Sequence, residues 1–187
     1  MAPPIGRERE VAIQRSIEDI GVVPADDIAS DVATFLAFAN LSDNDGVWLD
    51  FERNAASQMT GDQAFEFMDR VAQKLGRACG IYGGDQIRGQ IKPDDPKWID
   101  MAQVSSLWQC RYIGLNAADN EELFNLIKPI PPWTKNTLIQ YTDGANGPQP
   151  HSVNGLDPNH DDLNAFLGTR AELAQIWPGM QVVFPTV

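Results

Sequence analysis

The stretch GVWLDFE occupies residues 46–52 and decides how the rest of the chain is interpreted. Its apolar run from Val47 to Leu49 ends in Asp50 and Glu52, with turn-forming residues on both sides, which predicts a short buried strand. Side chains two residues apart on a strand share a face, so the two carboxylates should point the same way, about 7 Å apart along the backbone. Such a pair suits cleavage of a glycosidic bond, where one acid donates a proton and the other stays ionised. A strand end that enters a solvated loop is the alternative interpretation.

Helical and strand-like segments alternate along the chain around residues 46–52. Before them, residues 7–20 have weak helical periodicity, residues 21–27 resemble a short strand and turn, and a helix is expected from an N-cap at Asp26 to about Asn40. After them, a capping box of Thr60 and Gln63 opens a helix that Gly76 ends, with Ala64, Phe65, Met68, Val71, Ala72 and Leu75 as its buried stripe. Further strands are predicted at 78–84, 104–112 and 137–144, a short helix near 85–90, and a last element at 161–166. Buried strands that alternate with helices predict an α/β parallel sheet or barrel.

Several chemically capable side chains fall at the ends of these predicted strands. In parallel α/β folds, the active groups lie at the carboxyl ends of the strands. The pattern therefore predicts one shared cleft, to which the following residues contribute: Asp50, Glu52, Tyr82, Tyr112, Tyr141 and Asp162.

Length and charge limit the class of protein. The chain has 187 residues, of which 43% are hydrophobic and 21% charged, which predicts a single globular domain over residues 1–187. The net charge of -12 argues against nucleic acid as a partner, because phosphate binding requires a basic surface. No segment approaches the roughly 20 apolar residues of a membrane helix, and no apolar core follows the charges of residues 1–10, so no secretory signal is visible.

Cysteine and histidine are scarce. Cys79 and Cys110 both fall in predicted strands, which predicts buried free thiols rather than a disulfide framework. His151 and His160 are the two histidines and are expected in loops, so no metal site is predicted.

Five motifs together resemble the family-25 glycoside hydrolases, the muramidase-type lysozymes of bacteria and phages. The resemblance covers about residues 21–170. Its closing part is the most diagnostic. In chain order the motifs are LDFE (49–52), GIYGG (80–84), SLWQCRY (106–112), LIQYTDG (138–144) and NGLDPNHDDLNAF (154–166).

The resemblance implies a modified TIM-like (β/α) barrel that hydrolyses the β-1,4 bond between N-acetylmuramic acid and N-acetylglucosamine in the glycan strands of peptidoglycan. It implies no metal and no organic cofactor. Glu52 matches the catalytic acid, Asp50 its charge-stabilising or orienting partner, and Asp162 a substrate-binding aspartate of the cleft. The positions that line the sugar cleft or lie behind it are Tyr82, Trp108, Tyr112, Gln140 and Tyr141.

These roles are physically coherent, although each has an alternative. Sugar rings pack on aromatic faces, and their hydroxyls require a few fixed polar groups. Burial and the neighbouring Asp50 should raise the pKa of Glu52. Alternatively, Trp108 and Tyr82 are core aromatics, Gln140 pairs only with backbone, and Asp162 is the N-cap of a last helix.

The chain departs from the family pattern at its start. Residues 1–20 offer no counterpart of the first two barrel strands or of the first-strand aspartate, and Ile139 replaces a tryptophan. Three explanations stay open: a piece of a longer protein, a barrel completed by a homo-oligomer or by a partner chain, or a degenerate homologue that binds glycans without cleaving them. If active, the protein is expected to act on the cell wall, with release in the manner of a phage endolysin as one route.

Overall fold

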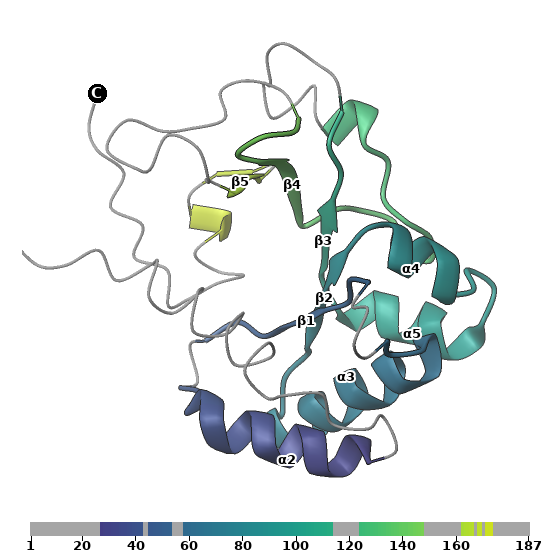
Figure 1. Ribbon diagram of the computed structural model, residues 1–187, viewed down its shortest axis with the longest axis vertical. Coiled ribbons are helices and arrows are strands. Elements are labelled where there is room, and N and C mark those ends of the chain that lie inside the picture. Colours follow the sequence, from purple (N-terminus) through teal and green to yellow (C-terminus); the bar gives the residue numbers. More distant parts are fainter. Residues whose placement is uncertain are drawn as a thin grey trace, which may run out of the picture. The chain divides into compact units, whose positions relative to one another are not determined.

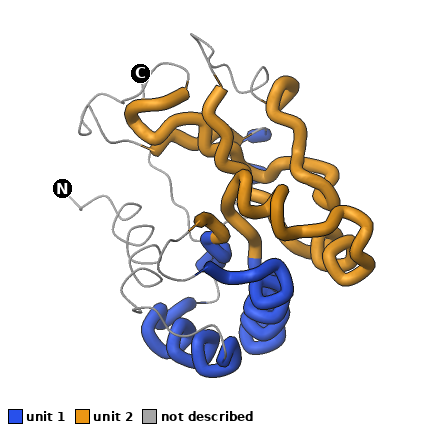
Figure 2. The backbone as a smooth tube through the Cα atoms, turned by 45° about the vertical axis from the view of Figure 1, so that its right-hand side comes forward, with its two compact units in different colours: residues 1–50, 54–79, 168–187 blue, residues 51–53, 80–167 orange. Residues whose placement is uncertain are grey.

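The computed structural model forms two compact units, which are described separately (Figures 1 and 2). The first unit comprises residues 1–50, 54–79 and 168–187, and the second comprises residues 51–53 and 80–167. The expectation of a single domain stays a prediction. The described residues are 27–42, 45–53, 58–113, 124–147, 162–166, 168–169 and 171–173. The predicted element at 7–20, both histidines, and all but Asp27 of the strand and turn predicted at 21–27 lie outside them.

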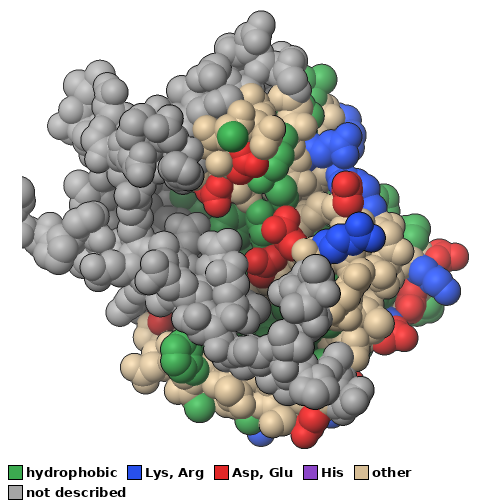
Figure 3. All heavy atoms as spheres, in the orientation of Figure 1, with side chains coloured by type: hydrophobic (Ala, Val, Ile, Leu, Met, Phe, Trp, Pro, Cys, Tyr) green, Lys and Arg blue, Asp and Glu red, His purple; other side chains and the backbone are tan. Residues whose placement is uncertain are grey.

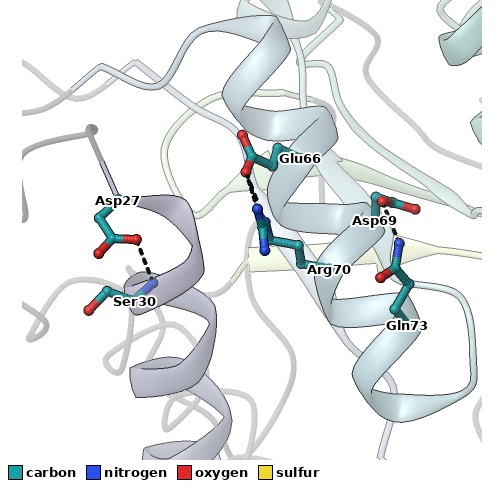
Figure 4. Close-up of polar contacts among 6 residues, drawn as sticks. All are labelled: Asp27, Ser30, Glu66, Asp69, Arg70 and Gln73. Atoms are coloured by element: carbon teal, nitrogen blue, oxygen red, sulfur yellow. Dashed lines mark hydrogen bonds and ion pairs between the residues drawn. The ribbon is translucent and has the colours of Figure 1, made fainter.

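In the first unit, helix α2 (Ile28–Ala39) and helix α3 (Gly61–Leu75) accompany strand β1 (Trp48–Asp50). The Asp27 carboxylate caps α2 by accepting a hydrogen bond from the Ser30 amide at 3.0 Å (Figure 4). The N-cap is therefore Asp27, one residue after the Asp26 that the sequence predicts. Asn40 ends the helix in the left-handed conformation, which asparagine tolerates better than most residues.

Helix α3 has the termini that its sequence predicts. Thr60 and Gln63 form the reciprocal capping box, and Gly76 adopts the left-handed C-cap conformation. Its buried residues include Phe67, whose ring lies 5.8 Å from that of Phe35 on α2. The predicted stripe contained the half-buried Phe65 instead. Side chains four residues apart on α3 also form hydrogen bonds, and Figure 4 shows Glu66 with Arg70 and Asp69 with Gln73.

The second unit contains a sheet. Strands β2 (Gly80–Gly83), β3 (Leu107–Cys110) and β4 (Leu138–Asp143) are parallel neighbours, and β5 (Asp162–Ala165) pairs antiparallel with β4. Between β2 and β3 the chain forms helices α4 (Asp85–Gln90) and α5 (Pro96–Val104), which Figure 1 shows together on one side of these strands. The fully buried side chains of this unit include Ile81, Ile87, Trp98, Leu107 and Ile139.

The structure confirms the α/β class, whereas closure into a barrel stays a prediction. Two local expectations are corrected. The strand predicted at 104–112 is shorter, because Val104 still belongs to α5. Asp162 is not a helix N-cap, because it begins β5.

Within the described residues, none of the helices is long and apolar enough to cross a membrane.

Candidate active site

Strand register in the second unit brings five side chains to one face of the sheet. Tyr82 is in register with Trp108, Cys110 with Gln140, and Gln140 with Asn164. Because neighbours in register share a face and side chains alternate along each strand, these five residues form one surface, here called the site face. Asp162 precedes Asn164 by two positions on β5 and belongs to the same face.

Direct contacts connect the site face across the strands. The Tyr82 hydroxyl donates a hydrogen bond to Oε1 of Gln140, whose side chain is only 4% exposed. The Tyr82 and Trp108 rings meet edge to face, with centroids 5.2 Å apart. Trp108 Nε1 donates to Oδ1 of Asn164 at 2.8 Å. Tyr82, Trp108 and Gln140, three of the predicted sugar-binding residues, therefore lie together, and Gln140 bonds with a side chain as well as with backbone.

Glu52 lies at the carboxyl end of β2. The amide of Phe51 donates to the carbonyl of Tyr82 at 2.8 Å, which holds the segment of residues 51–53 beside this strand. Gly83 permits the approach, because a Cβ at this position would lie 2.6 Å from the Phe51 carbonyl oxygen, and its φ of 149° favours glycine. Strand β1 ends at Asp50, so the expectation that Asp50 and Glu52 both lie on the strand is wrong.

The surroundings of Glu52 favour its protonated form. Although the residue remains exposed, desolvation raises the pKa of its carboxyl, and the negative charge of Asp162 raises it further. A hydrogen bond with the Cys110 side chain acts in the opposite direction. The upward direction agrees with the sequence expectation, and Asp162 is a charge that contributes to it. The contribution expected of Asp50 stays a prediction. Glu52 is thus suited to donate a proton.

Two residues of this group were missed in the sequence. Cys110 is half-buried rather than a core thiol, and its side chain forms hydrogen bonds with Tyr82 and Tyr112. Asn164 contacts Trp108 directly. Cys110 is the last residue of its strand, and Asn164 lies two residues after Asp162. These positions along the strands are the sequence signal from which both residues could have been assigned to the site.

Tyrosine hydroxyls in this group stay neutral. Desolvation is the main cause that raises the pKa of both Tyr82 and Tyr112, and the cysteine nearby adds to it. Burial also raises the pKa of Cys110. The group therefore offers neutral hydrogen-bond donors beside the carboxylates of Glu52 and Asp162.

Two predicted site residues are not among those that the strand register joins in the site face. Tyr141 packs against an apolar cluster of Ile127, Ile139 and Ala165. Asp50 is the half-buried last residue of β1 and belongs to the first unit. The roles of Tyr141 in sugar binding and of Asp50 in catalysis stay predictions.

Acidic and basic side chains gather in different places on the face drawn in Figure 3. Figure 3 shows Asp and Glu side chains next to hydrophobic ones in the middle of the face drawn, whereas Lys and Arg side chains lie toward the side of α4. In the part of the chain that the structure describes, His, Cys, Asp and Glu side chains form no group of three that could hold a metal ion. Glu52 can donate a proton, and the residues of the site face can bind hydroxyls and pack against a sugar ring.

Comparisons with known proteins give similarity at the level of structure. No protein-family model and no curated protein sequence matches the chain. The muramidase of Trichobolus zukalii superposes with a TM-score of 0.55 and 16% identity, over 82% of this chain and 67% of its own. The muramidase of Acremonium alcalophilum gives a TM-score of 0.52 and 17% identity, over 82% and 67%. A family GH25 lysozyme from Aspergillus fumigatus superposes with a TM-score of 0.52 and 14% identity, over 80% of this chain and 66% of its own. At such low identity the similarity concerns the fold, and the chain has the fold of these muramidases and of the family GH25 lysozyme.

Proposed function

We propose that this chain is a lysozyme-type glycoside hydrolase that cleaves the β-1,4 bond between N-acetylmuramic acid and N-acetylglucosamine in peptidoglycan. The observation that carries the proposal is the protonation-favouring environment of Glu52, beside Asp162 and the polar and aromatic site face. The shared fold with muramidases supports the choice of substrate class.

In the proposed reaction, Glu52 is the general acid. Its carboxyl proton passes to the glycosidic oxygen as the bond between this oxygen and the anomeric carbon breaks. The positive charge that develops on the sugar is stabilised by Asp50 or by the N-acetyl group of the substrate itself. Water then adds to the anomeric carbon, and its proton returns to Glu52, so that the enzyme is regenerated.

The other residues are assigned to binding. Tyr82 and Trp108 supply aromatic surface for the apolar faces of sugar rings. Asp162 and Tyr112 offer polar groups to hydroxyl and amide substituents. The buried Gln140 lies behind them, where it accepts the hydrogen bond of the Tyr82 hydroxyl. Asp162 also keeps the pKa of Glu52 high, so activity should fall as the pH rises through that pKa.

The test is mass spectrometry of soluble fragments after incubation with purified peptidoglycan. The wild-type protein should release fragments with reducing N-acetylmuramic acid ends, and Glu52→Gln should release them at least about 100-fold more slowly, as loss of a general acid predicts. Glu66→Gln is the matched control, because Glu66 is an exposed residue of α3 that pairs with Arg70. Full activity of Glu52→Gln would exclude the assignment.

The same experiment separates the alternative of a non-catalytic glycan-binding homologue. If the folded wild-type protein binds peptidoglycan in a pull-down but releases no fragments, it is a glycan-binding protein without catalytic activity. Absence of both binding and release would exclude both functions.

A further inference from the structure

Asn164 forms a connection that passes over a whole strand. Its Oδ1 accepts the hydrogen bond from Trp108 Nε1 at 2.8 Å. Trp108 lies on β3 and Asn164 on β5, while Gln140 of the intervening strand β4 is the register neighbour of Asn164. The bond therefore ties the indole ring to the antiparallel strand at the end of this sheet.

A second connection of the same kind lies beside it. The Tyr82 hydroxyl on β2 donates to Gln140 on β4 and so passes over β3. With the edge-to-face contact of Tyr82 and Trp108, the two bonds join four side chains from four strands. Each aromatic ring thus has its polar atom held by an amide oxygen, which restricts how the ring can turn.

Strand β5 is held to the sheet by its pairing with β4, by Ala165 in an apolar cluster, and by the bond of Asn164 to the indole. It is four residues long, and its pairing with β4 shifts register between Gln140 and Thr142. An irregularity of this kind disrupts the backbone ladder locally, so side-chain contacts add to what the backbone bonds provide. The indole bond therefore contributes to holding both the ring of Trp108 and the strand that carries Asp162.

We propose that Asn164 is a positioning residue for glycan binding, which holds the Trp108 indole in the orientation on which a sugar ring packs. Trp108 is only half-buried, so part of its ring remains accessible to a ligand. The inference rests on the proposed function and deepens it, because it assigns a residue that controls sugar binding rather than bond cleavage. Asn164 acts through Trp108 and takes no part in proton transfer.

The experiment compares Asn164→Ala with the wild-type protein for binding of chitotetraose, a neutral β-1,4-linked N-acetylglucosamine tetramer, and for kinetics on peptidoglycan. Loss of one neutral hydrogen bond should raise Kd for the tetramer and KM for peptidoglycan by about 3- to 10-fold, while kcat stays within about twofold. Asn164→Asp keeps the acceptor oxygen and should restore tetramer binding. Asn125→Ala, at an exposed position of the same unit, is the control and should leave both constants unchanged.

A double-mutant cycle identifies the bond as the cause. Trp108→Phe keeps an aromatic ring but removes the N–H donor, so Asn164→Ala should weaken binding no further in that background. Additive losses, unchanged binding by Asn164→Ala, or a loss confined to kcat would each overturn the positioning role while leaving the proposed function intact. Failure of the wild-type protein to bind the tetramer and to cleave peptidoglycan would instead overturn both.

Discussion

At the scale of single residues, the protonation of Glu52 depends on a balance of opposing neighbours. Desolvation and Asp162 raise the pKa of the carboxyl, and the hydrogen bond with Cys110 lowers it. A carboxylate that is less favourable in the folded protein than in the unfolded chain is destabilising whenever it is ionised. The ionised form of Glu52 thus has a small cost in stability at neutral pH.

The stability of Glu52→Gln should therefore depend on pH in a defined direction. Because the folded pKa is raised, the contribution of Glu52 is most favourable below its unfolded pKa of about 4.3 and is lost as the pH rises through the folded value. Above that value, the neutral glutamine variant should unfold at a higher temperature than the wild type, by a small margin because Glu52 is exposed. Thermal unfolding at about pH 4 and pH 7 measures the difference. If the unfolding temperature of Glu52→Gln exceeded that of the wild type by more at about pH 4 than at about pH 7, the raised pKa of Glu52 would be contradicted.

At the scale of elements, the helix termini of the first unit are set by local side chains. Thr60 accepts from the amide of Gln63 at 3.3 Å, and Gln63 Oε1 accepts from the amide of Thr60 at 2.8 Å. These bonds satisfy amide groups that have no partner within the helix. Helix α3 buries Ala64, Met68 and Val71. The capped first turn therefore begins a helix whose one face is packed into the core.

Removal of the cap should destabilise the protein without affecting the site face. Thr60→Ala is expected to lower the free energy of unfolding by about 1 kcal/mol, the usual effect of an N-cap substitution. Urea unfolding monitored by circular dichroism measures this loss. Thr34→Ala is the comparison, because Thr34 is exposed within α2 and is not an N-cap, so it should change stability much less. Equal losses in the two variants would mean that the capping box contributes no specific stability.

At the scale of the whole molecule, net charge should control access to a charged polymer. The chain carries 14 basic and 26 acidic residues, and acidic side chains lie in the middle of the face in Figure 3. Anionic cell walls repel such a protein, and added salt screens the repulsion.

Cleavage of intact anionic cell walls should accordingly increase with ionic strength. The Debye length falls from about 30 Å at 0.01 M to about 8 Å at 0.15 M salt, so kcat/KM on walls should rise over this interval. Binding of neutral chitotetraose should hardly change and serves as the control. A rate on walls that falls with added salt would instead mean that local basic side chains direct the approach.

Local sequence determined the elements, because caps, turns and apolar spacing act over a few residues. The capping box at Thr60, the glycine that ends α3, and the strands that contain Tyr82 and Gln140 were all predictable in this way. Motif resemblance indicated the shared fold as well. Tertiary structure alone decided that Asn164 meets Trp108, that Cys110 forms hydrogen bonds with the tyrosines, and that Asp162 raises the pKa of Glu52. These contacts depend on the register between strands far apart in the sequence, and register comes from the packing of the whole sheet rather than from any local pattern.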